Sequence, residues 1–498
     1  MLHYPRSMTE LQHAAKATRP RIQPAEEGDR RPLSVSARLG RLQFHQSGKF
    51  RVLQFADIQD GPKVSKDTIS LIEASLDATR PDLVIFNGNQ IAGYDSAYAL
   101  TSRKRRWDAR PASASSEASG ERYAAALEHT RELVRATIEQ LVHPLADRGV
   151  PWAVTFGNHD FQCGLDNAEI ESICREFPGC INPERAADGT TGIAVKHGVK
   201  HGVKHDVGDM EQDFGLPEQP VIACAPGTFA LSVTDVDRTY DVLGLVLLDS
   251  GDYARSGGYG SPSEAALRFL ADAPGLMAAQ SKQLQQDRQD EQDSPREPRK
   301  TPSTLPCMVF QHFPIEQYYR LLKPVAATAA RAIEGYRNFA GRHFVLNEDK
   351  TQPGSYLGEG VSCPDADSGE FAILDKAGYF AISAGHDHRN AFVGSVPVGT
   401  DGDRQMMMVA SPTSGFGSYG PVPAKRAARL FEFDIRHPYE PRTQLLEYDE
   451  LVGKPSAGKA YAYGMTSESK PDSEGMDLLH RPTWWSKTWN KLVSLFRR

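Results

Sequence analysis

Residues 152–160 read WAVTFGNHD, a short apolar run that ends in a Gly-Asn-His-Asp turn. An apolar run followed by a polar turn occurs four more times between residues 57 and 388. A run of this kind is typical of a buried strand entering a loop. We therefore expect the polar turns to converge at one edge of a sheet. The other four turns are Asp57-Ile58-Gln59, Gly88-Asn89, Gln311-His312-Phe313 and Gly385-His386-Asp387-His388.

The size and charge of the chain indicate its domain organisation and the kinds of partner it can bind. Its 498 residues exceed the length at which single cores stop growing, roughly 250 to 300 residues, so we expect one large domain with insertions or extensions. The formal net charge is −7, from 57 basic and 64 acidic residues. Because this balance gives no broad basic field, nucleic acid is not expected as a partner.

Cysteine usage and the N-terminal sequence favour a cytoplasmic location. The six cysteines include no CxxC pair, and charges stand where a signal peptide needs an apolar core. Both features are typical of a reducing compartment. No apolar run is long enough to cross a membrane.

Hydrophobic periodicity predicts a layered α/β fold from residue 42 onward. Helices are predicted at 65–79 and 123–147, and the end of the polar run 280–300 is predicted to be disordered. The domain is expected to span 40–450, after a flexible arm at 1–38, with insertions at about 96–122, 186–225 and 255–303. Strands are predicted at 42–45, 50–56, 83–86, 152–156, 243–248, 308–310, 379–383, 406–410 and 429–433.

Two segments carry patterns outside the strand motifs. Residues 196–205 repeat a His-containing unit of four, which is typical either of a metal-binding tract or of a slipped duplication in an exposed loop. Residues 482–498, after a polar linker at 457–480, predict an aromatic, basic amphipathic helix. Such a helix is typical of an anchor at a membrane surface, here the inner face, or of a helix docked on the protein or a partner subunit. Nothing in the sequence indicates the oligomeric state.

The order and character of the five turns resemble the calcineurin-like metallophosphoesterases. The family pattern is Asp-x-His, Gly-Asp, Gly-Asn-His-(Asp/Glu), His and Gly-His-x-His, each on a loop after a strand. The resemblance spans about residues 50–435, and three blocks match fully. Two further stretches, 248–251 and 358–363, are similar to the branch related to purple acid phosphatases. The resemblance implies a four-layer α/β/β/α sandwich with surface insertions.

The resemblance also implies two divalent ions, which would clamp a phosphate ester and activate a water. His159 would donate a hydrogen bond or proton to the reacting phosphate, and Asp160 would orient His159. One ion would be held by Asp57, Gln59, Asn89 and His388. The other would be held by Asn89, Asn158, His312 and His386.

Two residues depart from the family pattern. Gln59 replaces a histidine, and an amide oxygen is a weaker ligand for zinc or iron than an imidazole nitrogen. Asn89 replaces the aspartate that bridges both ions, which removes a negative charge. The expected cofactor is therefore one or two divalent ions of Mn, Fe, Zn or Mg. Nearby acids such as Asp60 or Asp249 are candidates to replace the lost charge, although Asp60 should face away from Gln59 and Asp249 is more typical of a turn or cap.

These observations predict a metal-dependent phosphatase or phosphodiesterase with a weakened or altered metal site. The alternative is a catalytically silent protein that uses the same pocket to bind a phospho-ligand or a protein. The identity of the phosphate-ester substrate would depend on the insertions, which carry no recognisable pattern.

Overall fold

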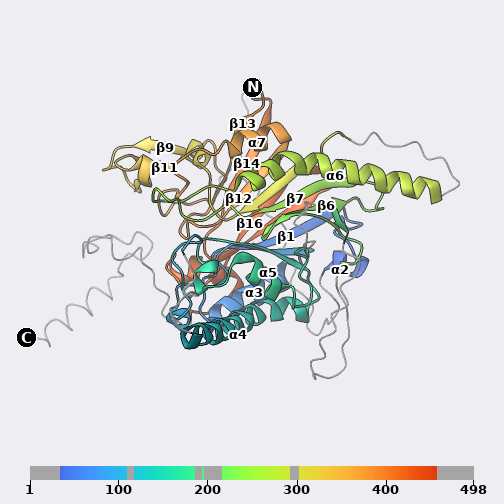
Figure 1. The fold of residues 1–498 in the computed structure, drawn as a ribbon. Coiled ribbons are helices and arrows are strands. Elements are labelled where there is room, and N and C mark those ends of the chain that lie inside the picture. Colours follow the sequence, from blue (N-terminus) through green and yellow to red (C-terminus); the bar gives the residue numbers. More distant parts are fainter. Residues whose placement is uncertain (1–33, 109–116, 185–192, 196–215, 292–301, 457–498) are drawn as a thin grey trace, which may run out of the picture. The chain divides into compact units, whose positions relative to one another are not determined.

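A computed structural model describes residues 34–108, 117–184, 193–195, 216–291 and 302–456 (Figure 1). The His-rich repeat at 196–205, the linker at 457–480 and the predicted helix at 482–498 lie outside these residues. Within them, no helix is both long and apolar enough to span a membrane.

One sheet has five strands in the order β16-β15-β1-β2-β3. Strands β1, β2 and β3 run parallel to one another, while β15 and β16 are antiparallel additions. The strands are β1 Lys49–Phe55, β2 Leu83–Asn87, β3 Trp152–Thr155, β15 Ala427–Asp434 and β16 His437–Glu447.

The second sheet has eight strands in the order β13-β14-β12-β8-β7-β6-β5-β4. Its centre, from β7 through β8 and β12 to β14, is parallel. The strands are β4 Ile193–Val195, β5 Pro220–Ala225, β6 Thr228–Thr234, β7 Asp241–Leu248, β8 Cys307–Gln311, β12 Tyr379–Ala384, β13 Phe392–Val398 and β14 Arg404–Ala410. A separate small sheet contains β9 Leu322–Val325, β10 Ile333–Glu334 and β11 His343–Leu346.

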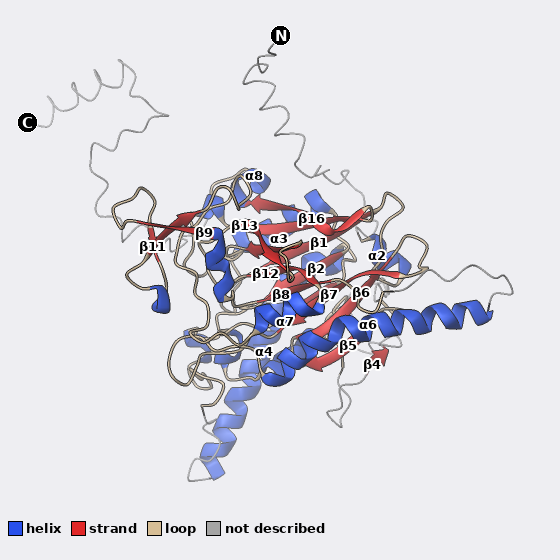
Figure 2. Cartoon of the chain, turned by 90° about the horizontal axis from the view of Figure 1, so that it is seen from above, coloured by secondary structure: helices blue, strands red, loops and turns tan. Residues whose placement is uncertain are grey.

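Helices cover the outer faces of both large sheets, as Figures 1 and 2 show. Helices α3, α4 and α5 pack on the five-stranded sheet, and α6 and α7 pack on the eight-stranded sheet. The helices are α2 Val35–Leu39, α3 Lys66–Thr79, α4 Glu117–Asp147, α5 Asn167–Cys174, α6 Glu264–Glu291, α7 Glu370–Ala377 and α8 Tyr448–Val452. The predicted four-layer α/β/β/α sandwich is confirmed.

Side chains that alternate along each strand supply the hydrophobic cores on both faces of the sheet. In β1, Phe50 and Val52 enter the core between the two sheets, while Leu53 and Phe55 enter the core beneath α3 and α4. Successive strand side chains point to opposite faces, so one strand supplies both cores. Full burial of each such side chain contributes roughly 1.5 to 3 kcal/mol.

Several predicted boundaries differ from the structure. Residues 34–39 belong to the fold, because Ser34 and Ser36 bond to Asp82, the residue before β2. The predicted strand at 42–45 makes only an isolated bridge from Gln43 to Thr234. Helix α6 continues to Glu291, so 280–291 is helical, and the region 255–303 contributes a core helix. Likewise, β4 and β5 within the region 186–225 are the last two strands of the eight-stranded sheet.

Candidate functional site

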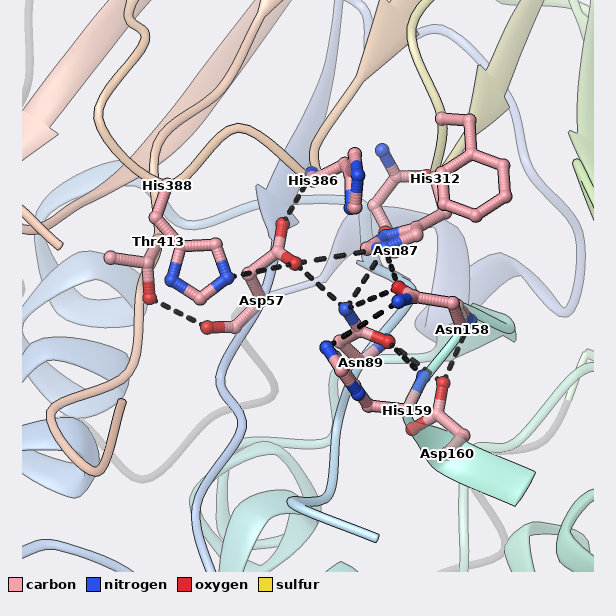
Figure 3. Close-up of polar contacts among 12 residues, drawn as sticks. Asp57, Asn87, Asn89, Asn158, His159, Asp160, His312, His386, His388 and Thr413 are labelled. Atoms are coloured by element: carbon pink, nitrogen blue, oxygen red, sulfur yellow. Dashed lines mark hydrogen bonds and ion pairs between the residues drawn. The ribbon is translucent and has the colours of Figure 1, made fainter. Parts of the chain in front are cut away.

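The five turns meet at the carboxyl ends of parallel strands from both sheets (Figure 3). Asp57 follows β1, Asn89 follows β2, Asn158 follows β3, His312 follows β8, and His386 with His388 follows β12. Loops at the carboxyl ends of parallel strands are the usual binding position in α/β sheets. We call this cluster the five-turn site.

The backbone of the five-turn site is strained. Left-handed φ angles occur at eight non-glycine residues of the described chain, and four of them are here: Asp57 at 52°, Gln59 at 44°, Asn89 at 54° and His386 at 72°. Each such conformation costs about 1 to 3 kcal/mol and persists only where the surroundings enforce it. The fold therefore stores strain at the predicted ligands.

Two glycines allow the turns to approach closely. A Cβ at Gly157 would lie 2.2 Å from Oδ1 of Asn89, and a Cβ at Gly385 would lie 2.6 Å from Oδ2 of Asp57. Real Cβ atoms do not tolerate such distances. Glycine is therefore required where the loops cross.

Asn89 lies at the centre of the hydrogen bonds (Figure 3). Its Oδ1 accepts a hydrogen bond from the backbone N–H of His159 at 2.8 Å. Its Nδ2 lies 3.1 Å from Oδ1 of Asp57, 3.2 Å from Oδ1 of Asn158 and 2.9 Å from Nε2 of His312. The amide nitrogen, and not the oxygen, thus faces the predicted ligands of both ions.

Asp57 is fully buried and contacts three turns. Its Oδ2 accepts the backbone N–H of His386 at 2.7 Å, and its Oδ1 lies 3.3 Å from Nε2 of His388. Burial acts to raise the pKa of Asp57, but the imidazoles around it, His312 first and then His388, hold that pKa below its ordinary value. Asp57 is therefore ionised.

His388 pairs with that carboxylate. Its Nδ1 faces the carbonyl of Tyr419 at 2.6 Å, so Nδ1 carries a proton. Burial acts to lower the pKa of His388, but Asp57 outweighs it, and the pKa lies above its ordinary value. A protonated His388 places a positive charge beside Asp57.

His312 and Asn158 present converging acceptors. Nδ1 of His312 faces the carbonyl of Asn87 at 3.3 Å, and burial lowers the pKa of the ring, so Nδ1 holds the proton and Nε2 has a free lone pair. This Nε2 lies 3.0 Å from Oδ1 of Asn158. Both atoms therefore require a donor or a cation.

His386 has no hydrogen-bond partner on either ring nitrogen within the described part of the chain, although the ring is buried. Burial holds its pKa well below the ordinary value, so the ring is neutral. Its edge packs against Tyr259 at 4.3 Å between ring centroids and against Phe313 at 4.8 Å. The two ring nitrogens of His386 can therefore bond to a group that enters the site.

His159 is held by Gln162 and not by the neighbouring Asp160. Nδ1 of His159 lies 2.7 Å from Oε1 of Gln162, and burial lowers the pKa of His159 to about 4. The carboxylate of Asp160 instead accepts backbone N–H groups of Gly157 and Asn89, both at 2.8 Å, and of the two residues after Asn89. Asp160 thus ties two turns together, and Gln162 orients the imidazole.

The side chains of Gln59, Asp60 and Asp249 make no hydrogen bond to the predicted metal ligands described above. Gln59 is buried, and its side chain makes no hydrogen bond to any described residue. Asp60 bonds to Ser65, Thr68 and Gly417 and therefore faces away. Asp249 pairs with both terminal nitrogens of Arg106 at 2.8 and 2.9 Å, which is a structural role.

The donor atoms do not fit the two-ion cluster that the resemblance implies. Asp57 is the single carboxylate among the predicted ligands, and the bridging position presents an amide nitrogen, which is not a ligand for divalent ions. Within the described ranges, no three His, Cys, Asp or Glu side chains are grouped so as to hold a metal. Two cations would therefore lack both charge compensation and a bridge.

Sequence reasoning missed an aromatic and basic rim beside the turns. The hydroxyl of Tyr253 accepts from Nδ2 of Asn158 at 2.8 Å, and Tyr253 stacks on Tyr259. The guanidinium of Arg105 lies 3.8 Å above the ring of Tyr253. The basic run 103–106 was visible in the sequence, but its place at the site depends on the contact of Arg106 with Asp249.

Comparison with known proteins agrees with this geometry. The family model for calcineurin-like phosphoesterases matches residues 50–219. Phosphatase DCR2 of Saccharomyces cerevisiae is 21% identical over 391 residues, which cover 73% of this chain but only 47% of that protein. Probable inactive purple acid phosphatase 29 of Arabidopsis thaliana is 21% identical over 483 residues, which cover 93% of this chain and 92% of that protein.

A solved structure of PhoD matches 81% of this chain and 69% of its own chain, with a TM-score of 0.37 and 9% identity. The family-model match begins at β1 and includes the first three of the five turns. The other two turns follow in family order on β8 and β12. Residues 50–219 are therefore similar to the calcineurin-like phosphoesterase family, and the two later turns continue its motif order.

Proposed function

We propose that this chain binds a phosphate ester at the five-turn site and that recognition, rather than two-ion hydrolysis, is its function. The observation that carries the proposal is the position of Arg105. Its guanidinium lies over Tyr253, whose hydroxyl is bonded to Asn158. Arginine is well suited to phosphate because its planar fork of N–H groups matches phosphate oxygens.

The charge of Arg105 is not neutralised by a carboxylate of the described residues, in contrast to that of Arg106. Arg106 is neutralised by Asp249 and donates its backbone N–H to Asp252 at 2.7 Å. The side chain of Arg105 donates only to the carbonyl of Lys104, at 3.1 Å, and within the described residues no carboxylate lies within ion-pair distance of it. Its charge is therefore available to an anion.

The loop that carries Arg105 is fixed to the site. The backbone N–H of Arg103 donates to the carbonyl of Gln162 at 3.0 Å, and Nε2 of Gln162 donates to the carbonyl of Lys104 at 3.2 Å. The same Gln162 holds His159. One residue thus couples the basic loop to the imidazole at the centre of the site, which favours recognition of a single ligand by both.

Other donors support the same ligand class. His386 is neutral and carries one N–H without a partner among the described residues, which is available to a phosphate oxygen. The ring of Tyr94 packs edge-on against that of His159, with 5.0 Å between the centroids, and Tyr94 is 52% exposed. It therefore lies where the site meets solvent. Tyr94 and Tyr253 would flank an aromatic or planar group on the ester.

Replacement of Arg105 by alanine is expected to weaken binding of p-nitrophenyl phosphate about 10- to 100-fold. A charge-assisted hydrogen bond contributes about 1.5 to 3 kcal/mol, and each 1.4 kcal/mol is about tenfold in affinity. Isothermal titration calorimetry at low ionic strength measures the change. The matched control is Arg268→Ala on α6, where the arginine is exposed and pairs with Glu264, and its affinity should equal that of the wild type. Equal affinities for Arg105→Ala and the wild type would remove the basis of the proposal.

A second candidate is slow hydrolysis with one divalent ion. It is favoured by the unpartnered ring nitrogens of His386 together with the converging acceptors of His312 and Asn158. These three residues would hold such an ion, which would polarise the ester. The amide protons of Asn89 oppose it, because they point at two of the three donors.

A further inference from the structure

The orientation of the Asn89 side chain is fixed by its surroundings. Oδ1 accepts the backbone N–H of His159 at 2.8 Å, and the backbone N–H of Asn89 itself donates to Asp160 at 2.8 Å. Rotation of the amide by half a turn would place its NH₂ against the N–H of His159, donor against donor. Gly157 closes the space behind the amide oxygen. The NH₂ group must therefore face the five-turn site.

The NH₂ group meets the predicted ligands of both ions. One proton is directed toward Oδ1 of Asp57, at 3.1 Å from the nitrogen. The other is directed toward Nε2 of His312 and Oδ1 of Asn158, at 2.9 and 3.2 Å. By the family pattern, Asp57 belongs to the first ion, while His312 and Asn158 belong to the second.

We propose that the two amide protons of Asn89 take the place of the two cations, so that the five-turn site assembles without metal. Each proton satisfies acceptors that an ion would otherwise bind. His388 provides a second donor where the first ion would lie, because its Nε2 lies 3.3 Å from the same oxygen of Asp57. The inference is independent of the proposed phosphate binding, because it concerns how the site is held together.

An aspartate at position 89, as in the family pattern, would make the site depend on metal. An oxygen at the position of Nδ2 would lie about 3 Å from Oδ1 of Asp57, where two carboxylates repel each other and force a proton onto one of them. His312 and Asn158 would also lose their donor. Bound cations would relieve the repulsion while leaving both carboxylates ionised. Asparagine thus makes the site independent of metal, and aspartate would make it dependent.

Thermal unfolding of the full chain tests the proposal. The wild type should show the same Tm in EDTA and in Mn²⁺ or Zn²⁺. Asn89→Asp should lose about 5 °C or more in EDTA and regain most of it in Mn²⁺ or Zn²⁺. The matched control is Asn87→Asp, two residues earlier and equally buried, whose amide donates to the carbonyl of Gln311 at 2.7 Å, outside the ring of ligands. Asn87→Asp should lose stability that metal does not restore.

Two outcomes would overturn the proposal. One is a wild-type Tm that falls in EDTA, which needs no variant and so remains decisive if Asn89→Asp does not fold. The other is an Asn89→Asp protein as stable as the wild type in EDTA. Failure of phosphate binding would leave both results unchanged, so the two proposals fail separately.

Discussion

The double variant Gln59→His with Asn89→Asp is expected to hydrolyse p-nitrophenyl phosphate in Mn²⁺, Zn²⁺ or Fe²⁺ on the order of 10³-fold faster than the wild type. The substitutions restore the bridging carboxylate and the missing imidazole beside residues that already stand in position. Stabilisation of transition-state charge by bound ions contributes several kcal/mol, and each 1.36 kcal/mol is about tenfold in rate. Turnover of p-nitrophenyl phosphate with each ion measures the gain.

Three comparisons make this gain specific. Gln59→His alone should be no faster than the wild type, because the bridge would still present an amide nitrogen to both ions. Addition of His159→Ala to the double variant should remove most of the gain, because His159 lies beside Asn158 at the site. Metal-dependent turnover by the wild type that equals the double variant would instead support hydrolysis with one ion.

Gly157→Ala is expected to lower the free energy of unfolding by about 3 to 5 kcal/mol and to abolish ligand binding. The added Cβ would lie 2.2 Å from Oδ1 and 2.8 Å from the backbone nitrogen of Asn89. Relief requires the turn to move, which breaks the bond from His159 to Asn89 and loosens the contacts of Asp160. Overpacking and a lost buried hydrogen bond each cost about 1 to 3 kcal/mol. Chemical denaturation measures the loss.

Gly120→Ala is the control for Gly157→Ala. Gly120 lies inside α4, and a Cβ there would meet no atom within 4 Å. Alanine is favoured over glycine in a helix interior by about 1 kcal/mol, so this variant should be as stable as the wild type or slightly more so. A loss below about 1 kcal/mol for Gly157→Ala would show that the turns are not packed as described.

The central strands could be predicted because their sequences are continuous apolar runs. Strands β1, β2, β3, β7, β8, β12, β14 and β15 lie where the periodicity places them. Two of the strands that were missed carry proline or glycine: β13 contains Gly394 and Pro397, and β16 contains Pro438 and Pro441. Both lie at the edge of a sheet, where proline is tolerated. Helix α6 was missed because it contains Pro274 and ends in polar residues.

The convergence of the site could be predicted, but its internal hydrogen bonds could not. Motif order places the five turns together, because parallel strands end at one edge. The orientation of the Asn89 amide depends on a backbone N–H of His159, which no residue type reveals. The roles of Gln162 and Arg105 depend on contacts between segments distant in the sequence. Asp160, whose pKa is raised by burial to about 7, likewise bonds to backbone groups that a motif does not show.

Elemental analysis of the purified wild-type chain, after incubation with Mn²⁺, Zn²⁺ and Fe²⁺ and removal of free ions, tests the central claim most directly. If the amide protons of Asn89 stand in for the cations, the metal content should be far below one ion per chain, while Gln59→His with Asn89→Asp should retain close to two. A wild type that retains one or two ions per chain, and loses them when His386 is replaced by alanine, would contradict the account.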